Sequence, residues 1–561
     1  MGAGAVVAIV VIALVLAPAL PCGFPGGESC APDDDAAGLV PADALLYVHV
    51  NTDADSEQYE KASALADRLP TLTDQLIAAL PGAAGAGIEY DRDVRPWLGG
   101  EAAVALLRDG ADAVEQALLL EIDDENGAER FSDQLVGRRT DSSDVAGVAV
   151  TSRGRLATAE VDGFLVIGSR ESVRAVIEAQ DSDGSALADD DTAEEVVDEL
   201  PSDSLATAFV SEHGAADLFR AGAPLGSLEV FVGAAATTGA AAALVALDDG
   251  IEIETHSALD PERLEAAPGF FGAFAPFEPE LVGELSAQSL LYLGLGDPER
   301  SVKALLEQAT AEAPGLTEGF ERFSKELRKD GDVSIEREIL PLLAGEVAVG
   351  IEPPPKAGGD AGEENEDEAV PEEIEPGGPA PIPEEPGELD FSGVPYVVFV
   401  ADDVDEEQAR RTLADLQVPI AEALEPEESG QAPVFEGTDI AGVQARSLRI
   451  SPTVNLTYAI FDEKLVVATD PAGVEQVKSG ESSLPDSSQY EAATEGFGGD
   501  LATIIYLNLG DLIALAERQG LSEDPAYALF AGEVRRLQAM GLAVERDEES
   551  LDSRLRLTIE E

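Results

Sequence analysis

The chain has almost no cysteine, few histidines and few basic residues, and each shortage excludes a class of protein. It contains 2 cysteines, 3 histidines and 1 tryptophan in 561 residues, which excludes metal or redox centres built from several cysteines. Lys and Arg number 34 against 112 Asp and Glu, for a net charge of −78. A field of that sign repels nucleic acid and anionic lipid headgroups, so we expect neither as a partner.

The chain has enough hydrophobic residues to form folded domains. Hydrophobic residues make up 45% of the chain and charged residues 26%, so it can bury a core. Its length predicts two or more domains.

An uncharged apolar stretch opens the chain, from Ala3 to Leu20, and the first basic residue is Lys61. The stretch is close to the roughly 20 residues that span a bilayer. It predicts a single-pass membrane anchor over residues 1–21, followed by an acidic tether over 22–38, with the body outside the cytoplasm. A cleaved signal segment with a secreted body is the alternative, and a buried core helix is a third interpretation.

Both cysteines, Cys22 and Cys30, follow the apolar stretch directly. In an oxidising compartment they would form a small disulfide loop, which is our prediction. The alternative is two unpaired thiols in the tether.

The chain repeats itself. Five segments recur in the same order: 44–48 as 289–293, 98–104 as 343–349, 118–124 as 397–403, 162–167 as 462–467, and 205–207 as 501–503. Unrelated strands would not keep both order and spacing, so the pattern predicts a tandem duplication. We expect one repeat over residues 39–265 and a second over 286–561.

The spacing between matched segments grows abruptly after the second match, which indicates an insertion in the second repeat at residues 353–392. That segment is rich in proline and acidic residues and resembles a linker between domains. The alignment of the repeats instead makes it a loop inside the second repeat. Its composition cannot bury a core, so we expect it to be disordered.

Alternating apolar residues separated by turn residues predict short strands in adjacent pairs. Tight turns between them favour antiparallel pairing. The expected fold class is therefore α+β, a tandem duplication of an antiparallel sheet with helices packed on one face, preceded by one apolar N-terminal helix. Each repeat is expected to end in a hairpin, at about 240–259 and 541–559.

A connection over residues 266–285 joins the repeats and is rich in phenylalanine. It contains Phe270, Phe271, Phe274 and Phe277, in a chain that is only 5% aromatic. These rings would form an exposed apolar contact site for a lipid or a partner. The competing interpretation is that they pack the two repeats together.

Two strand motifs resemble a known family. The segment Pro41 to Val48 reads PADALLYV, and the segment Gly100 to Leu106 reads GEAAVAL. With the apolar N-terminal segment, their order is similar to that of the DUF3352 proteins, a bacterial and mainly actinobacterial group of unknown function. The resemblance covers most of the chain from about residue 39. It implies membrane attachment and supplies no catalytic residues.

No catalytic, cofactor-binding or metal-binding residues are predicted. His49, His213 and His256 are the only histidines, and none recurs in the other repeat, so no shared site depends on one. The catalytic motifs that sequence alone can reveal do not occur. Acidic clusters could bind Ca²⁺ weakly, but helix capping is the simpler interpretation. These clusters are at 33–35, 123–126, 181–183 and 189–191.

The sequence therefore favours a non-catalytic, membrane-anchored envelope protein that binds an extracytoplasmic partner or ligand. One alternative is a carrier or scaffold for an apolar ligand such as a lipid. Another is a hydrolase with an unrecognised carboxylate site, which would need two carboxylates of raised pKa in one pocket.

Overall fold

The computed structural model describes residues 34–70, 90–109, 113–137, 140–180, 185–214, 236–266, 275–300, 334–354, 394–423, 434–451, 454–480 and 482–560. The predicted anchor, the Cys22–Cys30 disulfide and three of the four connecting phenylalanines lie outside these residues, as does most of the acidic loop. Among the helices described, none is long and apolar enough to cross a membrane.

Twenty strands form one antiparallel sheet within these ranges. We call residues 34–266 the first half and residues 275–560 the second half. The first half contributes β1 Leu46–Asn51, β2 Leu98–Asp109, β3 Ala113–Ile122, β4 Asp141–Val145, β5 Val148–Arg153, β6 Leu156–Val161, β7 Phe164–Ser169, β8 Ala206–Ser211, β9 Thr237–Leu247 and β10 Gly250–Leu259. The second half contributes β11 Leu291–Gly296, β12 Glu346–Glu352, β13 Tyr396–Ala401, β14 Glu436–Ile440, β15 Val443–Arg449, β16 Asn455–Phe461, β17 Lys464–Ala468, β18 Leu501–Asn508, β19 Leu537–Arg546 and β20 Ser550–Ile559.

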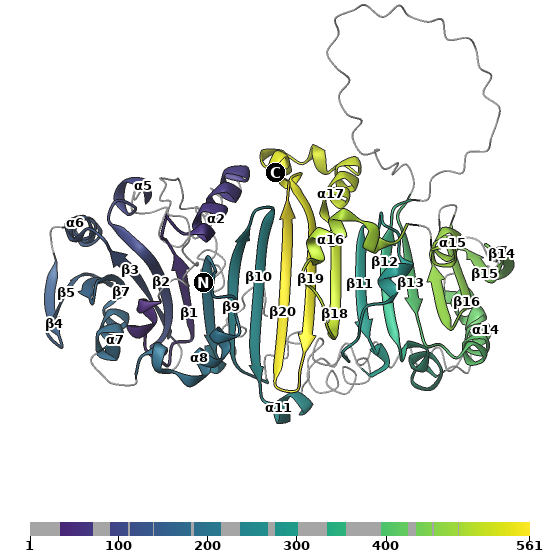
Figure 1. The fold of residues 1–561 in the computed structure, drawn as a ribbon, viewed down its shortest axis with the longest axis horizontal. Coiled ribbons are helices and arrows are strands. Elements are labelled where there is room, and N and C mark those ends of the chain that lie inside the picture. The colour runs from purple at the N-terminus through teal and green to yellow at the C-terminus, as the bar shows by residue number, and fades with distance from the viewer. Residues whose placement is uncertain are drawn as a thin grey trace, which may run out of the picture.

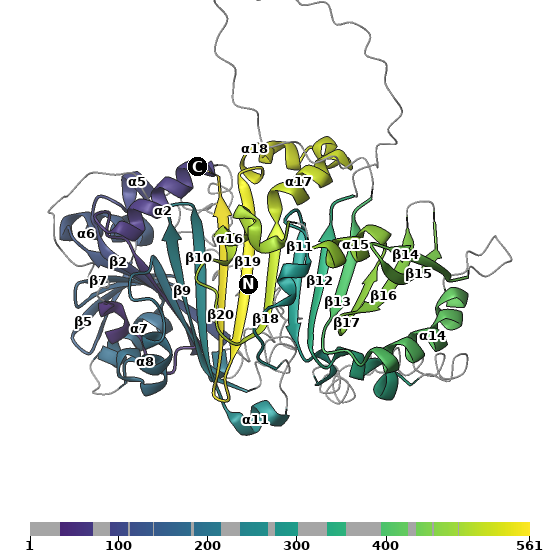
Figure 2. The same cartoon turned by 45° about the vertical axis from the view of Figure 1, so that its right-hand side comes forward.

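The two halves pair their strands in the same order. In the first half the order is β4-β5-β6-β7-β3-β2-β1-β8-β9-β10. In the second half it is β14-β15-β16-β17-β13-β12-β11-β18-β19-β20. The halves meet where β10 pairs with β20, a junction that we call the seam (Figures 1 and 2). The expected hairpins are therefore present, as β9–β10 and β19–β20.

Helices of the first half are α2 Glu57–Arg68, α5 Tyr90–Asp93, α6 Glu125–Val136, α7 Arg170–Gln180, α8 Asp191–Asp198 and α11 Pro261–Ala266, with 3₁₀ turns η1 Asp35–Gly38 and η2 Leu187–Asp189. Those of the second half are α14 Glu406–Ala423, α15 Pro471–Ser479, α16 Ser488–Thr494, α17 Leu509–Arg518 and α18 Ala531–Val534. Its short turns are η5 Leu281–Glu284, η6 Ile335–Ile339, η7 Leu340–Leu343, η8 Leu484–Asp486, η9 Leu521–Glu523 and η10 Tyr527–Leu529.

The expectation of helices on one face of the sheet is wrong, because they cover both. Tyr47 packs in one cluster with Val176 of α7 and Val196 of α8. Its neighbour Val48 points to the opposite face and packs with Leu65 of α2. All six residues of β1 are buried for this reason. A strand covered on both faces needs an uninterrupted apolar run, not an alternating one.

Acidic residues before helices act as caps, as the sequence indicated. The side chain of Asp124 accepts a hydrogen bond from the N–H of Asn126 at the start of α6. Asp190 accepts one from Ala193 at the start of α8. Each satisfies one N–H group that the first helical turn leaves without a partner.

The described residues next to the acidic loop and in the Phe-rich connection show where these two segments attach to the sheet. The strands β12 and β13, which flank the acidic loop, pair directly, and their first-half counterparts β2 and β3 do the same. Phe277 forms a bridge with Leu501 and packs against the core of the second half.

Candidate functional site

The seam carries a row of paired polar side chains. Along β10 and β20, Glu254 faces Arg554, and their side chains form an ion pair of 3.2 Å. Two residues further along, His256 faces Asp552, with 2.5 Å between Nδ1 and Oδ1. Opposite charges directly across an antiparallel pair stabilise it, so the Glu254–Arg554 pair favours the β10–β20 register.

A cavity of about 460 Å³ lies over the seam. It extends from α8, which contacts β9 and β10, to the end of α16, which contacts β19 and β20. Both halves therefore build it, and we call it the seam cavity. Seven carboxylates line it: Glu195, Glu199, Glu254, Glu545, Asp547, Glu549 and Asp552.

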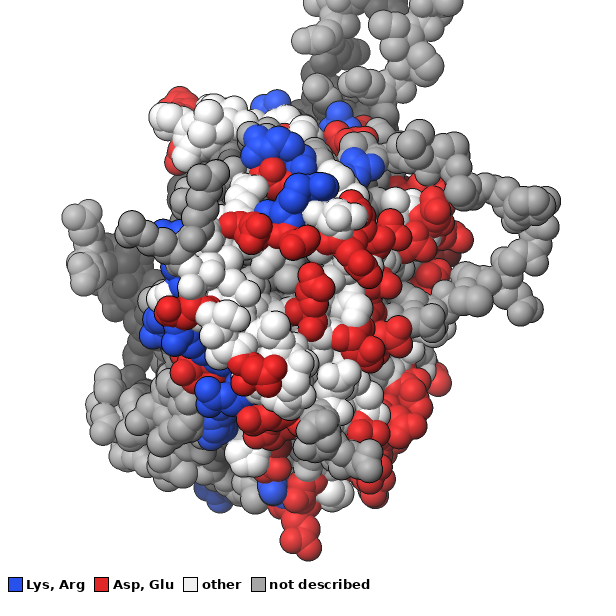
Figure 3. Space-filling view, turned by 90° about the vertical axis from the view of Figure 1, so that its left-hand side faces the viewer, with Lys and Arg blue, Asp and Glu red and all other residues white. Residues whose placement is uncertain are grey.

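Among the described residues that line the seam cavity, two carry basic groups, and both already have acidic partners. Arg554 pairs with Glu254, and His256 pairs with Asp552. The remaining acids on its wall give a strongly negative concave surface, which concentrates cations. Figure 3 shows that acidic side chains also spread over the outer end of the first half, where basic ones gather in fewer patches.

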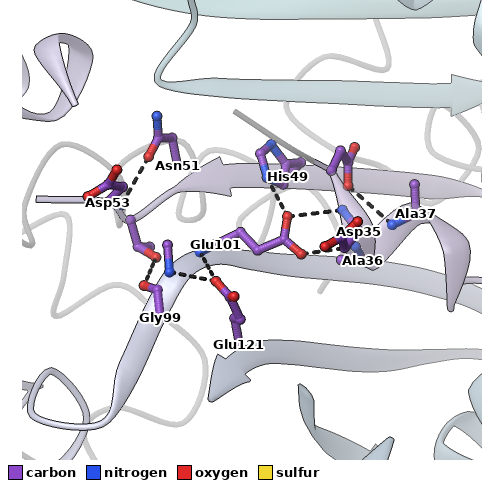
Figure 4. Close-up of polar contacts among 12 residues, drawn as sticks. Asp35, Ala36, Ala37, His49, Asn51, Asp53, Gly99, Glu101 and Glu121 are labelled. Carbon is purple, nitrogen blue, oxygen red and sulfur yellow. Dashed lines mark hydrogen bonds and ion pairs between the residues drawn. The ribbon is translucent and has the colours of Figure 1, made fainter. Parts of the chain in front are cut away.

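A second arrangement of polar groups lies in the first half, where Glu101 of β2 reaches the turn η1 (Figure 4). Its carboxylate accepts hydrogen bonds from the N–H groups of Asp35 at 3.2 Å and Ala36 at 3.0 Å. Its own N–H donates to Glu121, 3.1 Å away. A buried carboxylate thus holds the first residues of the described chain against the sheet.

His49 and Asp34 converge on the same carboxylate. Nε2 of His49 lies 3.2 Å from Oε2 of Glu101, and both side chains are buried. Asp34 is exposed and accepts a hydrogen bond from the hydroxyl of Tyr47. The ligand atoms of Asp34, His49 and Glu101 all lie within 4.8 Å of one another, and we call these three residues the η1 cluster.

Burial sets the protonation of this cluster. It raises the pKa of Glu101, although the hydrogen bond with His49 works in the opposite direction. For His49, burial lowers the pKa, but the hydrogen bond to Glu101 and the charges of Asp34 and Glu101 outweigh it, so the pKa is raised. Burial and the neighbouring Asp34 raise the pKa of Tyr47.

In the second half, Glu346 occupies the place of Glu101. Its carboxylate accepts hydrogen bonds from the N–H groups of Glu280 at 2.9 Å and Leu281 at 3.0 Å, at the start of η5. Gly294 stands where the first half has His49, since each faces an alanine of the next strand in the same register. The second half therefore keeps the cap and lacks the histidine.

Sequence reasoning missed both sites. It discounted His49 because the second repeat has no histidine there. A signal for the cap was nevertheless present, because a glutamate stands at the same place within an apolar strand of both repeats, in GGEAAV and AGEVAV. His213 lines a separate cavity of about 420 Å³ with Asp190 and Glu212.

Two carboxylates of raised pKa occur in β12. Burial raises the pKa of Glu346 to about 7, against its backbone hydrogen bonds, and raises that of Glu352 to about 7, against a hydrogen bond from Ser289. Neither residue lines the seam cavity or the cavity at His213.

Comparison with known proteins identifies the family. No curated protein matches the chain. Among solved structures, crystal form I of TP0453 is similar at 10% identity and a TM-score of 0.24, covering 42% of this chain and 80% of TP0453. Crystal form IV of TP0453 is similar at 11% identity and a TM-score of 0.25, covering 40% and 79%. The family model of DUF3352, described as a protein of unknown function, matches residues 1–555. The chain therefore belongs to the DUF3352 family.

Proposed function

We propose that this chain is a non-catalytic, membrane-anchored binding module on the outer side of a membrane, and that it binds a cationic partner in the seam cavity. The partner that fits best is a basic segment of another envelope protein. The apolar stretch at residues 3–20 would provide the anchor, and the sheet of the described residues would present the cavity.

The observation that carries this proposal is the charge of the seam cavity. Seven carboxylates face a concave volume of about 460 Å³, and both basic groups on its wall are already paired. Lysine or arginine side chains entering the cavity would meet carboxylates that have no ion-pair partner within the described residues, such as Glu195, Glu199 and Glu549. Complementary charge of this kind gives partner selection and rapid association.

We infer further that the two halves arose by duplication of one α+β unit. The matched sequence segments, the identical pairing order and the equivalent caps by Glu101 and Glu346 support this inference. The last strands of the two units pair antiparallel with each other, with Glu254 facing Arg554. Joining two copies there would create the seam cavity, which neither copy has alone.

Neutralising the acidic wall of the seam cavity is expected to weaken binding of a cationic peptide. The test uses the purified full chain and a fluorescent oligolysine peptide, with affinity measured by anisotropy at low salt. The triple change Glu195→Gln, Glu199→Gln and Glu549→Gln should raise Kd about tenfold, if each exposed charge contributes about 0.5 kcal/mol. Added salt should reduce the difference.

A matched variant separates the cavity from the overall charge. Glu125→Gln, Glu129→Gln and Glu171→Gln remove the same charge from exposed positions on α6 and α7. We expect this control to change Kd less than twofold, a limit of about 0.4 kcal/mol. Equal weakening in both triple variants would show that the peptide follows net charge alone and would refute the seam cavity as the site.

A separate experiment tests whether the body of the chain lies on the outer side of the membrane. Intact cells producing the protein should lose the body of the chain to externally added protease, while a cytoplasmic marker survives. A body that is degraded only after lysis would contradict the external location and leave the cationic binding site untouched.

A further inference from the structure

We propose that the η1 cluster, Asp34, His49 and Glu101, is a binding site for a divalent transition metal, with Zn²⁺ as the best fit. Within the described ranges, it is the one place where three metal-ligating groups come within 4.8 Å of one another. An imidazole with carboxylates is a ligand set that suits zinc. Calcium is disfavoured because it takes six to eight oxygen ligands.

The spacing of the two buried ligands is already close to that of a zinc site. Zinc holds nitrogen and oxygen ligands at about 2.0–2.2 Å, so two ligands of a tetrahedron lie about 3.3 Å apart. Nε2 of His49 and Oε2 of Glu101 are 3.2 Å apart. Asp34 is exposed while His49 and Glu101 are 3% and 4% exposed, so an ion would enter from the side of Asp34 and keep a position open to water.

The second half shows that the cap does not need these groups. Glu346 binds the N–H groups at the start of η5 without a histidine, and the position equivalent to Asp34 is Pro279. A side chain could not even be added at Gly294, where a Cβ atom would lie 2.4 Å from the hydroxyl of Tyr292. Asp34 caps η1 by accepting a hydrogen bond of 3.1 Å from the N–H of Ala37, and its position still brings a carboxylate next to His49. His49 is the group of the cluster that capping leaves unexplained.

The hydrogen bonds of the cluster allow Glu101 to exchange its contact with His49 for a bond to the metal ion. Oε1 of Glu101 can keep its bond to the N–H of Ala36 while Oε2 turns from His49 to the ion. Nε2 of His49 must then carry no proton, so the neutral ring binds with its proton on Nδ1, and a protonated ring releases one proton. Because protons compete with the ion for the ring nitrogen, metal affinity should fall as the pH drops.

Titration of the full chain with Zn²⁺ by isothermal calorimetry tests the proposal. We expect one site per chain with micromolar or tighter affinity, and proton release that grows as the pH is lowered. His49→Gln should weaken this site about 100-fold or more. Asp34→Asn, which changes an exposed side chain and should leave the fold intact, is expected to weaken it about tenfold. With Co²⁺ in place of Zn²⁺, wild-type protein should show the absorption of a tetrahedral site.

His256→Gln is the matched control, because His256 also pairs with a carboxylate but lies at the seam. It should bind Zn²⁺ as the wild type does. Circular dichroism verifies that each variant is folded. Absence of a stoichiometric site in the wild type, or equal affinity in Asp34→Asn, His49→Gln and the wild type, would overturn the proposal and reduce the η1 cluster to a cap.

Discussion

Replacement of Gly250 by alanine is expected to destabilise the protein by about 3 kcal/mol or more, by opening the seam. Gly250 begins β10 and faces Thr558 of β20. A Cβ atom there would lie 1.9 Å from the carbonyl oxygen of Leu557 and 3.0 Å from its carbonyl carbon. These are backbone atoms of the paired strand, so no side-chain rotation can relieve the overlap. The end of β20 must move away from β10.

The seam magnifies this change because, in the described part of the chain, β10 and β20 are the strands that join the sheets of the two halves. Urea unfolding followed by circular dichroism should show a lower midpoint for Gly250→Ala than for the wild type. The variant should also show a broader or split transition, because two uncoupled halves need not unfold together.

Gly283→Ala provides the control. Gly283 lies in η5, and a Cβ atom at that position would have no heavy atom within 4 Å. Its free energy of unfolding should stay within about 0.5 kcal/mol of the wild-type value, the usual range for a surface change. A Gly250→Ala protein with the same midpoint and the same cooperativity would show that the β10–β20 register is not the one described.

The seam itself shows the limit of prediction from sequence. The hairpins 240–259 and 541–559 were predicted because strand alternation and turn residues are local signals. That the two hairpins pair with each other was not predicted. This pairing joins residues some 300 positions apart, and it depends on facing charges such as Glu254 and Arg554, which no local pattern reveals.

The prediction that helices cover one face of the sheet failed for a related reason. The sequence of β1, LYVHVN, begins with the apolar run Leu46 to Val48, in which Tyr47 and Val48 point to opposite faces and are both buried. A run of this kind indicates a strand covered on both sides. We expected coverage on one side because antiparallel sheets commonly expose a face to water. The sheet of this protein departs from that tendency because a hydrophobic cluster packs on each of its faces.

The η1 cluster was missed through the comparison of the repeats. A residue present in one repeat only was taken as evidence against a site, so His49 was set aside. The fold reverses this inference. Because Glu346 performs the shared structural task with a glycine at the place of His49, His49 is the residue of the first half that needs another explanation.

Glu352 gives the second large expected effect: Glu352→Leu should stabilise the protein at pH 8 and have much less effect at pH 4. The side chain is fully buried. One carboxylate oxygen accepts a hydrogen bond of 2.5 Å from Ser289, and the other has no partner in the part of the chain that the structure describes. A buried carboxylate that is only half satisfied is costly when ionised. The first half has Leu107 at the equivalent position, so a leucine suits this place in the sheet.

The sign of the pH dependence follows from the direction of the shift. Burial raises the pKa of Glu352 to about 7, from an ordinary value of 4.5. The folded protein therefore holds this proton more tightly than the unfolded chain does. Its contribution to stability is complete below pH 4.5 and is lost as the pH rises to about 7. A shift of this size corresponds to roughly 3 kcal/mol at pH 8.

Urea unfolding of wild type and Glu352→Leu, measured from pH 4 to pH 8 at constant ionic strength, isolates this contribution. Glu346 also has a pKa of about 7, but it is present in both proteins and cancels in the difference. The gain in unfolding free energy should therefore grow with pH up to about 7 and then level off. Glu160→Leu, which makes the same change at an exposed position of β6, is the control for the replacement itself. If the gain from Glu352→Leu were independent of pH, Glu352 would not be ionising inside the second half.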